Sequence, residues 1–156
     1  MPIVYVKGDL VEAPEKVIVH GCNAQGKMQS GVAKAVRAAW PNAYTAYMKV
    51  YNWNVNDPRK GNKLDTGIII PAVCGDKVIV NAITQEYYGR DKDIVYVSYK
   101  AIRQAMIHLR ILARVYDQTH IAMPKIGSGL GNGDWDTIAK IIEEELANYT
   151  VKVYIQ

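Results

Sequence analysis

The sequence predicts an α/β protein, a three-layer α/β/α sandwich around a mixed sheet. Two observations lead to this fold class. Apolar runs typical of strands alternate along the chain with segments of helical periodicity, and a hairpin signal near the middle joins two of the strands. A third observation concerns size. The chain has 156 residues, no internal repeat and no low-complexity segment, so we expect one domain over residues 1–156 with a substantial core.

The first half of the chain predicts two strands followed by two helices. The run "IVYV" (3–6) predicts a strand, and "KVIVHGCN" (16–23) predicts a second strand that leads into a loop. A helix follows from Gly31, because small apolar side chains share one face and charged ones another. Pro41 begins a new turn, and "AYTAYMKVY" (43–51) predicts a second helix.

The second half opens with the hairpin and then returns to alternation. Two apolar runs, 66–75 and 77–84, are joined at Gly75-Asp76, a dipeptide typical of tight hairpins. Segment 96–116 predicts a long helix. The remaining expected elements are a strand at 119–123, a helix at 135–146 with Asp134 as its N-cap, and a strand at 151–155.

Composition narrows the class of protein. The formal net charge of +4 suits an anionic small molecule, and we interpret the basic cluster 57–63 as a solvated loop rather than a nucleic-acid site. Cys22 and Cys74 make no disulfide framework, so we expect free thiols. No apolar run approaches ~20 residues and the N-terminus does not resemble a signal peptide. We therefore expect a cytoplasmic protein with no membrane partner.

Two glycine-rich loops each leave a strand and enter a helix. They are "HGCNAQGKMQSG" (20–31) and "MPKIGSGLGNGDWD" (123–136). Glycine lets several backbone N–H groups point into one concavity, and a following helix N-terminus adds partial positive charge. Two such loops side by side would cradle a diphosphate. The alternative is that they are plain turns and helix caps, and neither matches a Walker or Rossmann glycine pattern.

Two titratable residues near these loops each have two interpretations. His20 ends an apolar strand, where it can act as an acid or base at the mouth of a crevice or serve as a hydrogen-bonded structural histidine. Asp9 follows the first strand, where it can accept a hydrogen bond from an exocyclic amine or cap a turn. We expect no metal, because His20 and Cys22 have no second pair of ligands at useful spacing.

Four separated motifs resemble the macrodomain family, in its ADP-ribose 1''-phosphate phosphatase branch. They are "YVKGDL", "VIVHGCNAQGKMQSGVAKAV", "MPKIGSGLGNGDWDTI" and "VKVYIQ", which together cover nearly the whole chain in the family's order. The resemblance implies binding of ADP-ribose or its 1''-phosphate, with no cofactor. It implies that Asp9 and Leu10 lie at the adenine, that Asn23 lies at the terminal ribose, and that His20 and Asn23 are catalytic.

The resemblance also implies the remaining ligand-binding residues. They come from the first loop, the end of the central strand and the second loop: Ala24, Gln25, Ser30, Gly31, Val32, Ala33, Ile83, Thr84, Ile126, Gly127, Ser128, Gly129, Leu130 and Gly131.

One departure separates two branches of the family. The sequence is also similar to terminal ADP-ribose protein glycohydrolases, which carry a lysine and an aspartate where this chain has Gln85 and Gly131. We therefore expect a phosphatase that releases phosphate from ADP-ribose 1''-phosphate. The alternatives are an ADP-ribosyl hydrolase acting on protein or nucleic acid, and a reader without turnover. We expect a monomer, from a phage or bacterial setting.

Overall fold

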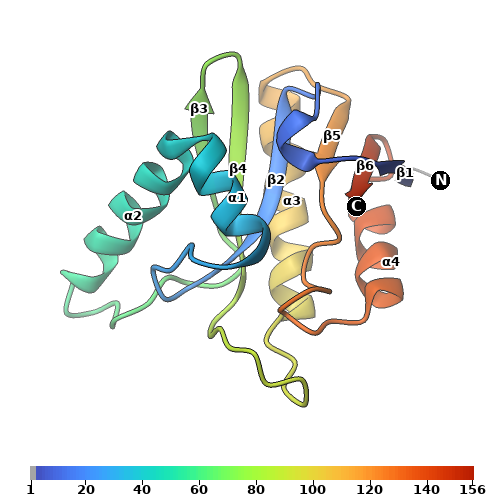
Figure 1. The fold of residues 1–156 in the computed structure, drawn as a ribbon. Helices are drawn as coiled ribbons and strands as arrows, with labels where there is room; N and C mark the ends of the chain where they lie inside the picture. The colour runs from blue at the N-terminus through green and yellow to red at the C-terminus, as the bar shows by residue number, and fades with distance from the viewer. Residues whose placement is uncertain (1–2) are drawn as a thin grey trace.

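The computed structural model describes residues 3–156, so the first two residues of the expected domain lie outside the described part. Strands and helices alternate as expected, and the predicted fold class is confirmed (Figure 1). The elements in chain order are β1 (Ile3–Lys7), η1 (Leu10–Glu12), β2 (Val17–Asn23), α1 (Gly31–Ala39), α2 (Pro41–Val55), β3 (Ile69–Cys74), β4 (Lys77–Gln85), α3 (Tyr99–Val115), β5 (His120–Met123), α4 (Trp135–Glu145) and β6 (Thr150–Ile155).

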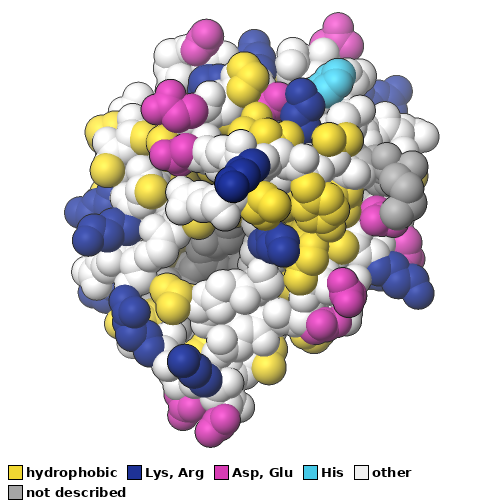
Figure 2. All heavy atoms as spheres, turned by 45° about the vertical axis from the view of Figure 1, so that its right-hand side comes forward, with side chains coloured by type: hydrophobic (Ala, Val, Ile, Leu, Met, Phe, Trp, Pro, Cys, Tyr) yellow, Lys and Arg dark blue, Asp and Glu magenta, His cyan; other side chains and the backbone are white. Residues whose placement is uncertain are grey.

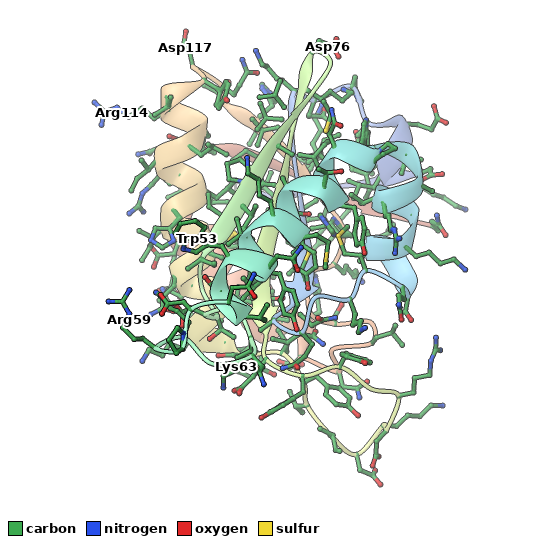
Figure 3. All side chains as sticks on the ribbon, turned by 90° about the vertical axis from the view of Figure 1, so that its left-hand side faces the viewer. Trp53, Arg59, Lys63, Asp76, Arg114 and Asp117 are labelled. Atoms are coloured by element: carbon green, nitrogen blue, oxygen red, sulfur yellow. The ribbon has the colours of Figure 1, made fainter. Side chains whose placement is uncertain are left out.

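The sheet has six strands in the order β1-β6-β5-β2-β4-β3. Every neighbouring pair is parallel except β3 with β4, which form the predicted hairpin. Asp76 at the hairpin tip lies at the opposite end of the molecule from Lys63 (Figure 3). Because β5, β2 and β4 are parallel neighbours, their carboxyl ends meet at one edge of the sheet, where ligands bind in folds of this kind.

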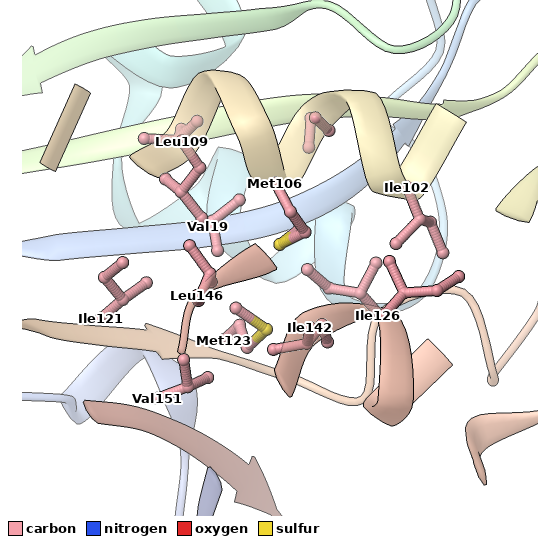
Figure 4. Packing of buried hydrophobic residues seen from close by; sticks show 14 of the residues in the cluster. Val19, Ile102, Met106, Leu109, Ile121, Met123, Ile126, Ile142, Leu146 and Val151 are labelled. Carbon is pink, nitrogen blue, oxygen red and sulfur yellow. The ribbon is translucent and has the colours of Figure 1, made fainter. Parts of the chain in front are cut away.

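Helices cover both faces of the sheet, and the sheet separates two hydrophobic cores, one beneath each layer of helices. The odd-numbered side chains at the start of β2, Val17 and Val19, pack with α3 and α4. The even-numbered Ile18 and Cys22 pack with α1 and α2 on the other face. Figure 4 shows the first of these cores, in which side chains of α3 and α4 meet those of the central strands. Because side chains alternate along the strand, neighbouring residues at the end of β2 point to opposite faces of the sheet.

The differences from the predicted elements lie at the boundaries of helices and of one strand, since β3 begins at Ile69 rather than at residue 66. The helix α2 continues to Val55, and the short helix η1 was not predicted. The helix α3 begins at Tyr99 rather than at residue 96, because Ser98 caps it by accepting a hydrogen bond from the Ala101 N–H (3.1 Å). Within residues 3–156, no helix has both the length and the apolar character that crossing a membrane requires.

Candidate functional site

A cleft of about 670 Å³ lies at the carboxyl ends of β2 and β4, a volume typical of small-molecule sites. The surface is hollowed near the middle of the view in Figure 2, with Lys and Arg side chains spread around the hollow. Six segments line the cleft: the end of β2, the loop between β2 and α1, the start of α1, the end of β4, the loop between β4 and α3, and the loop that follows β5. The two glycine-rich loops predicted from the sequence therefore face one space.

The first loop is shaped by hydrogen bonds of its own residues. The Asn23 Oδ1 accepts a hydrogen bond from the Gln25 N–H (2.9 Å), and the Asn23 amide donates to the Lys27 carbonyl (2.9 Å). The buried Tyr47 hydroxyl accepts from the Gly26 and Lys27 N–H groups (3.0 and 3.1 Å) and donates to the Asn23 carbonyl (2.6 Å). Asn23 lines the cleft, but its side-chain amide is used mostly in hydrogen bonds that hold the loop.

The N-terminus of α1 opens onto the cleft. Gly31, Val32 and Ala33 line it, and the N–H groups of a helix's first turn have no partner within the helix. Ser30, at the N-cap position, makes no side-chain capping bond. Its hydroxyl instead accepts a hydrogen bond from the Arg90 guanidinium (3.3 Å). The arrangement offers backbone donors and a cation to an anionic group.

The second loop is anchored in the core at its start. Ile126 is 2% exposed and lies beside Ile102 of α3 (Figure 4). Gly127 has φ of +79°, and a Cβ there would lie 2.7 Å from a methyl group of Val97, so both backbone and space require glycine. Its carbonyl accepts the Gly133 N–H (2.7 Å), which closes the loop. The backbone of residues 126–131 is thereby held along the cleft wall.

A third segment, residues 86–98, completes the cleft and was not predicted to do so. Tyr88, Gly89 and Arg90 line the cleft. The segment is pinned to the second loop, because the Asn132 amide donates to the Asp91 and Ile94 carbonyls (3.0 and 2.8 Å). Residues 86–95 have no periodicity and were given no predicted element, and residues 96–98 were predicted to begin the long helix.

His20 lies in the core and not in the cleft. Its side chain is 0% exposed and shares the α1/α2 face of the sheet with Ile18 and Cys22. Its Nε2 donates to the Asn81 Oδ1 (2.6 Å), since the Asn81 amide nitrogen already donates to the Ala43 and Ile70 carbonyls. Burial lowers the pKa of His20 to about 4, against a smaller opposing effect of the Asn81 hydrogen bond. The expected acid–base role is therefore not supported, and the structural alternative fits.

Gln85 and Gly131, the two positions expected to distinguish a phosphatase from a glycohydrolase, are neighbours in space. Gln85 and Gly131 both line the cleft. A Cβ on Gly131 would lie 3.1 Å from the Gln85 Oε1 and 2.7 Å from the Gly127 carbonyl oxygen. The Gln85 amide donates to the Tyr87 carbonyl (2.7 Å). The backbone leaves no room for a side chain at residue 131 while this geometry holds.

The charge of the cleft is positive. Among the lining residues that the structure describes, Lys27, Arg90 and Lys125 are basic and none is acidic or histidine. The nearby Glu86 forms an ion pair with Lys63, which holds the pKa of that carboxyl below its usual range. Burial raises the pKa of the Cys22 thiol, so it stays protonated. Over residues 3–156, no three His, Cys, Asp or Glu side chains gather as metal ligands.

The structure brings most of the predicted ligand residues to the cleft. Those that line it are Asn23, Ser30, Gly31, Val32, Ala33, Thr84, Ile126, Gly127, Gly129, Leu130 and Gly131. Seven predicted residues do not: Asp9, Leu10, His20, Ala24, Gln25, Ile83 and Ser128.

His20 is buried, and each of the other six residues has a structural role of its own. Leu10, Ala24 and Ile83 are buried in the α1/α2 core. The exposed Asp9 caps η1, its Oδ1 accepting from the Val11 N–H (3.1 Å). The Gln25 amide donates to the Glu86 carbonyl (3.0 Å), and the Ser128 hydroxyl donates to the Lys125 carbonyl (2.9 Å).

Comparison with known proteins matches the chain to one family. The model of the Macro domain matches residues 19–142. A protein of Enterobacteria phage T4, the uncharacterized 17.5 kDa protein of the tk-vs intergenic region, is 31% identical over 166 residues, covering 99% of this chain and 94% of that protein. The DNA ADP-ribosyl glycohydrolase of Mycobacterium tuberculosis is 27% identical over 136 residues, which is 87% of this chain. The chain spans about a third (36%) of that glycohydrolase.

Two further matches cover nearly the full chain. The ADP-ribose 1''-phosphate phosphatase of Meyerozyma guilliermondii is 21% identical and is aligned over 97% of both proteins. Among solved structures, a protein of unknown function from Bacteroides thetaiotaomicron superposes with a TM-score of 0.82 at 28% identity, covering 99% of this chain and 98% of that one.

Proposed function

The chain belongs to the macro domain family, and on that premise we propose that its cleft binds ADP-ribose and that it hydrolyses ADP-ribose 1''-phosphate to ADP-ribose and phosphate. One observation carries the proposal. The cleft joins two glycine-rich loops, a helix N-terminus and three basic side chains, with no acidic side chain among its described lining residues. Such a site suits a ligand with several negative charges. The phosphatase relative carries the name of this reaction.

We propose that the ligand lies along the carboxyl edge of the sheet. Asp9 at the end of β1 accepts a hydrogen bond from the adenine amine, through the carboxylate oxygen that does not cap η1. The diphosphate lies between the first turn of α1 and residues 126–131. The distal ribose and its phosphate then lie toward the ends of β2 and β4, and Asn23 keeps the first loop shaped around them.

In the proposed reaction water attacks the terminal phosphorus and the bond to the ribose oxygen breaks. The leaving oxygen takes a proton and becomes the free hydroxyl of ADP-ribose. Phosphoryl transfer depends chiefly on positioning and on stabilising the equatorial oxygens. The backbone N–H groups of α1 and the second loop, together with Lys27, Arg90 and Lys125, provide that stabilisation. His20 takes no part, because its side chain is 0% exposed in the core and is not among the residues that line the cleft.

Cleavage of a sugar–DNA or sugar–protein bond is less well supported by this geometry, although the mycobacterial relative is named for it. Gln85 cannot form a Schiff base, and the backbone around Gly131 excludes a carboxylate there. A reader without turnover is the second candidate. It is favoured by the lack of an acidic or imidazole side chain among the described lining residues, since such a site binds without a general base.

One set of measurements on the purified protein separates these functions. Calorimetry with ADP-ribose tests the shared binding step, and we expect measurable heat and a single site. Phosphate release from ADP-ribose 1''-phosphate then tests turnover. We expect release that falls at least tenfold in Arg90→Gln, because a cation near the transferred group contributes to transition-state stabilisation.

The control substrate is DNA carrying ADP-ribose. Release of free ADP-ribose from it, with none of the phosphatase activity, would replace the first proposal by the glycohydrolase one. Tight binding without product from either substrate would select the reader. Absence of heat with ADP-ribose would contradict all three.

A further inference from the structure

Asn132 belongs to the second glycine-rich loop, but its side chain binds the neighbouring segment 86–98. Its amide nitrogen donates to the Asp91 carbonyl (3.0 Å) and to the Ile94 carbonyl (2.8 Å), which uses both of its hydrogens. Its φ of +58° makes it one of two non-glycine residues with positive φ within residues 3–156. Glycine would adopt this conformation without steric cost, so the amide is what asparagine adds at this position.

The two carbonyls that Asn132 binds belong to one tight turn. The Ile94 N–H donates to the Asp91 carbonyl (3.2 Å), and the Asp91 N–H donates to the Tyr96 hydroxyl (3.2 Å). These bonds lie within the turn and its own segment, so they shape the turn without placing it against the cleft. Its place is set from the second loop, by the Asn132 amide and by the Gly131 carbonyl, which accepts the Tyr96 N–H (2.9 Å).

The start of the same segment has separate anchors. The Gln25 amide donates to the Glu86 carbonyl (3.0 Å), and the Gln85 amide donates to the Tyr87 carbonyl (2.7 Å). Residues 88–90 lie between these anchors and the turn that Asn132 holds, and all three line the cleft.

Arg90 is the residue of this stretch next to the turn. It directly precedes Asp91, and its guanidinium donates to the Ser30 hydroxyl at the N-cap position of α1 (3.3 Å). Arg90 therefore reaches from the segment across to the first loop. Its backbone is fixed on one side by the Asn132 amide, through the carbonyl of the very next residue.

We propose that Asn132 is a positioning residue that holds Arg90 at the cleft, where the guanidinium contacts the diphosphate of ADP-ribose. The inference rests on the proposed binding of ADP-ribose. Asn132 is not among the residues that line the cleft, so its side chain affects ligand affinity through the residues that it holds. Asn132 and Arg90 then act as one unit, and the effects of replacing them are not additive.

The test is a double-mutant cycle with Asn132→Gly, Arg90→Gln and the variant that combines them. Asn132→Gly removes the amide and keeps a residue that tolerates positive φ. Asp117→Gly is the matched control, because Asp117 also has positive φ (+55°) and lies far from Lys63, at the other end of the molecule (Figure 3). Calorimetry measures dissociation constants for ADP-ribose at about 50 and 300 mM NaCl.

Limited digestion of the unliganded proteins with trypsin gives a second measurement that needs no ligand. Trypsin cleaves after arginine and lysine, and Arg90 and Lys92 are both exposed in the segment that Asn132 holds. We expect cleavage after these two residues to be several-fold faster in Asn132→Gly than in the wild type. Asp117→Gly should be cleaved there at the rate of the wild type.

We expect Asn132→Gly to weaken ADP-ribose binding about two- to fivefold at low salt, the same range as for Arg90→Gln, because both remove the same cationic contact. The double variant should bind as the weaker single variant does, whereas independent residues would multiply their losses to about four- to 25-fold. The loss caused by Asn132→Gly should shrink at the higher salt concentration. Asp117→Gly should not weaken binding.

Three outcomes would overturn the inference. Losses that multiply in the double variant would mean that Asn132 does not act through Arg90. A loss in Asn132→Gly that salt leaves unchanged would assign the residue to the shape of the loop alone. Cleavage of Asn132→Gly at the rate of the wild type would mean that the amide does not hold the segment.

Failure of the proposed function gives a different result. Absence of ADP-ribose binding by the wild type would contradict that function and the ligand contact of Arg90 with it. Digestion with trypsin would still decide whether Asn132 holds the segment in place.

Discussion

Neighbouring residues of β2 lie in different environments, since His20 is buried in the core while Gly21 lines the cleft. Gly21 and Cys22 line the cleft, whereas the His20 side chain, earlier in β2, is buried in the core between the sheet and the helices α1 and α2. The histidine ring is enclosed, hydrogen-bonded to Asn81 and neutral, with a pKa lowered to about 4 by burial. Its contribution is therefore to stability, and that contribution depends on pH.

We expect the wild type to lose stability as pH falls from about 6.5 to about 4. The unfolded chain binds a proton at His20 in this window while the folded chain does not, so protonation favours unfolding. The shift from 6.5 to about 4 corresponds to about 3 kcal/mol of the free energy of unfolding. Urea unfolding across this pH range measures the free energy of unfolding of the wild type and of His20→Gln. Carboxylates affect both proteins equally, so the difference between the two pH curves isolates the effect of His20.

NMR keeps this prediction testable if His20→Gln does not fold. The His20 ring resonances of the wild type should not titrate between pH 5 and pH 8, where an ordinary histidine does. A midpoint near 6.5 would contradict the buried neutral state. Phosphate release should likewise show no inflection assignable to this group.

The sequence could not have revealed which way His20 points. The segment "VIVHGCN" is apolar on both faces, as expected of a central parallel strand, so its pattern carries no mark of the cleft face. Gln85 and Gly131 were predicted to distinguish the branches from separate motifs, but only the folded chain places them in contact. The hydroxyl of Thr84 was expected at the ligand, whereas its lack of a hydrogen-bond partner within residues 3–156 is visible only in the packed structure.

At the scale of elements, α2 acts on the cleft without lining it. Its Tyr47 is 0% exposed, and one hydroxyl satisfies two N–H groups and one carbonyl of the first loop. The glycine pattern of this loop was sufficient to predict that it lines a site, because the glycines lie close together in the sequence. That a tyrosine from the following helix fixes its shape is a long-range contact, which the helical periodicity of α2 did not indicate.

We expect Tyr47→Phe to lower the free energy of unfolding by about 1–3 kcal/mol, because it leaves the buried Gly26 N–H without an acceptor. Tyr51→Phe is the matched control, one turn further along α2, where the exposed hydroxyl donates only to the Asn62 carbonyl (3.3 Å). Urea unfolding measures both. Tyr47→Phe should also weaken ADP-ribose binding several-fold, and equal behaviour of the two variants would show that the loop does not depend on this hydroxyl.

At the scale of the whole molecule, the fold class, the hairpin and the edge that holds the cleft could be predicted from the alternation of elements, whereas the order of the strands comes from the structure. The sequence pattern did not predict where the segment 86–98 lies, because it has no helical or strand periodicity up to residue 95. Its position comes from hydrogen bonds to the second loop, such as that from the Tyr96 N–H to the Gly131 carbonyl (2.9 Å). Through it Arg90 is added to the basic lining of the cleft.

The remaining question at this scale is whether ligand affinity follows the net charge of +4 or the local charge of the cleft. Arg90 lines the cleft, whereas Arg114 lies at the far end of α3, away from Lys63 (Figure 3). Both arginines are exposed, and Arg90→Gln and Arg114→Gln lower the net charge equally. If the electrostatic field of the whole molecule sets the affinity, the two variants should bind ADP-ribose equally. If local contacts set it, only Arg90→Gln should bind more weakly.

We expect Arg90→Gln to weaken ADP-ribose binding about two- to fivefold at low salt, the range for one exposed ion pair, and Arg114→Gln to leave it unchanged. Because salt screens such a contact, the loss caused by Arg90→Gln should shrink between about 50 and 300 mM NaCl. Calorimetry at both salt concentrations measures the dissociation constants. Equal weakening by the two variants would contradict a local role for Arg90, and the dependence of affinity on salt would then belong to the charge of the whole protein.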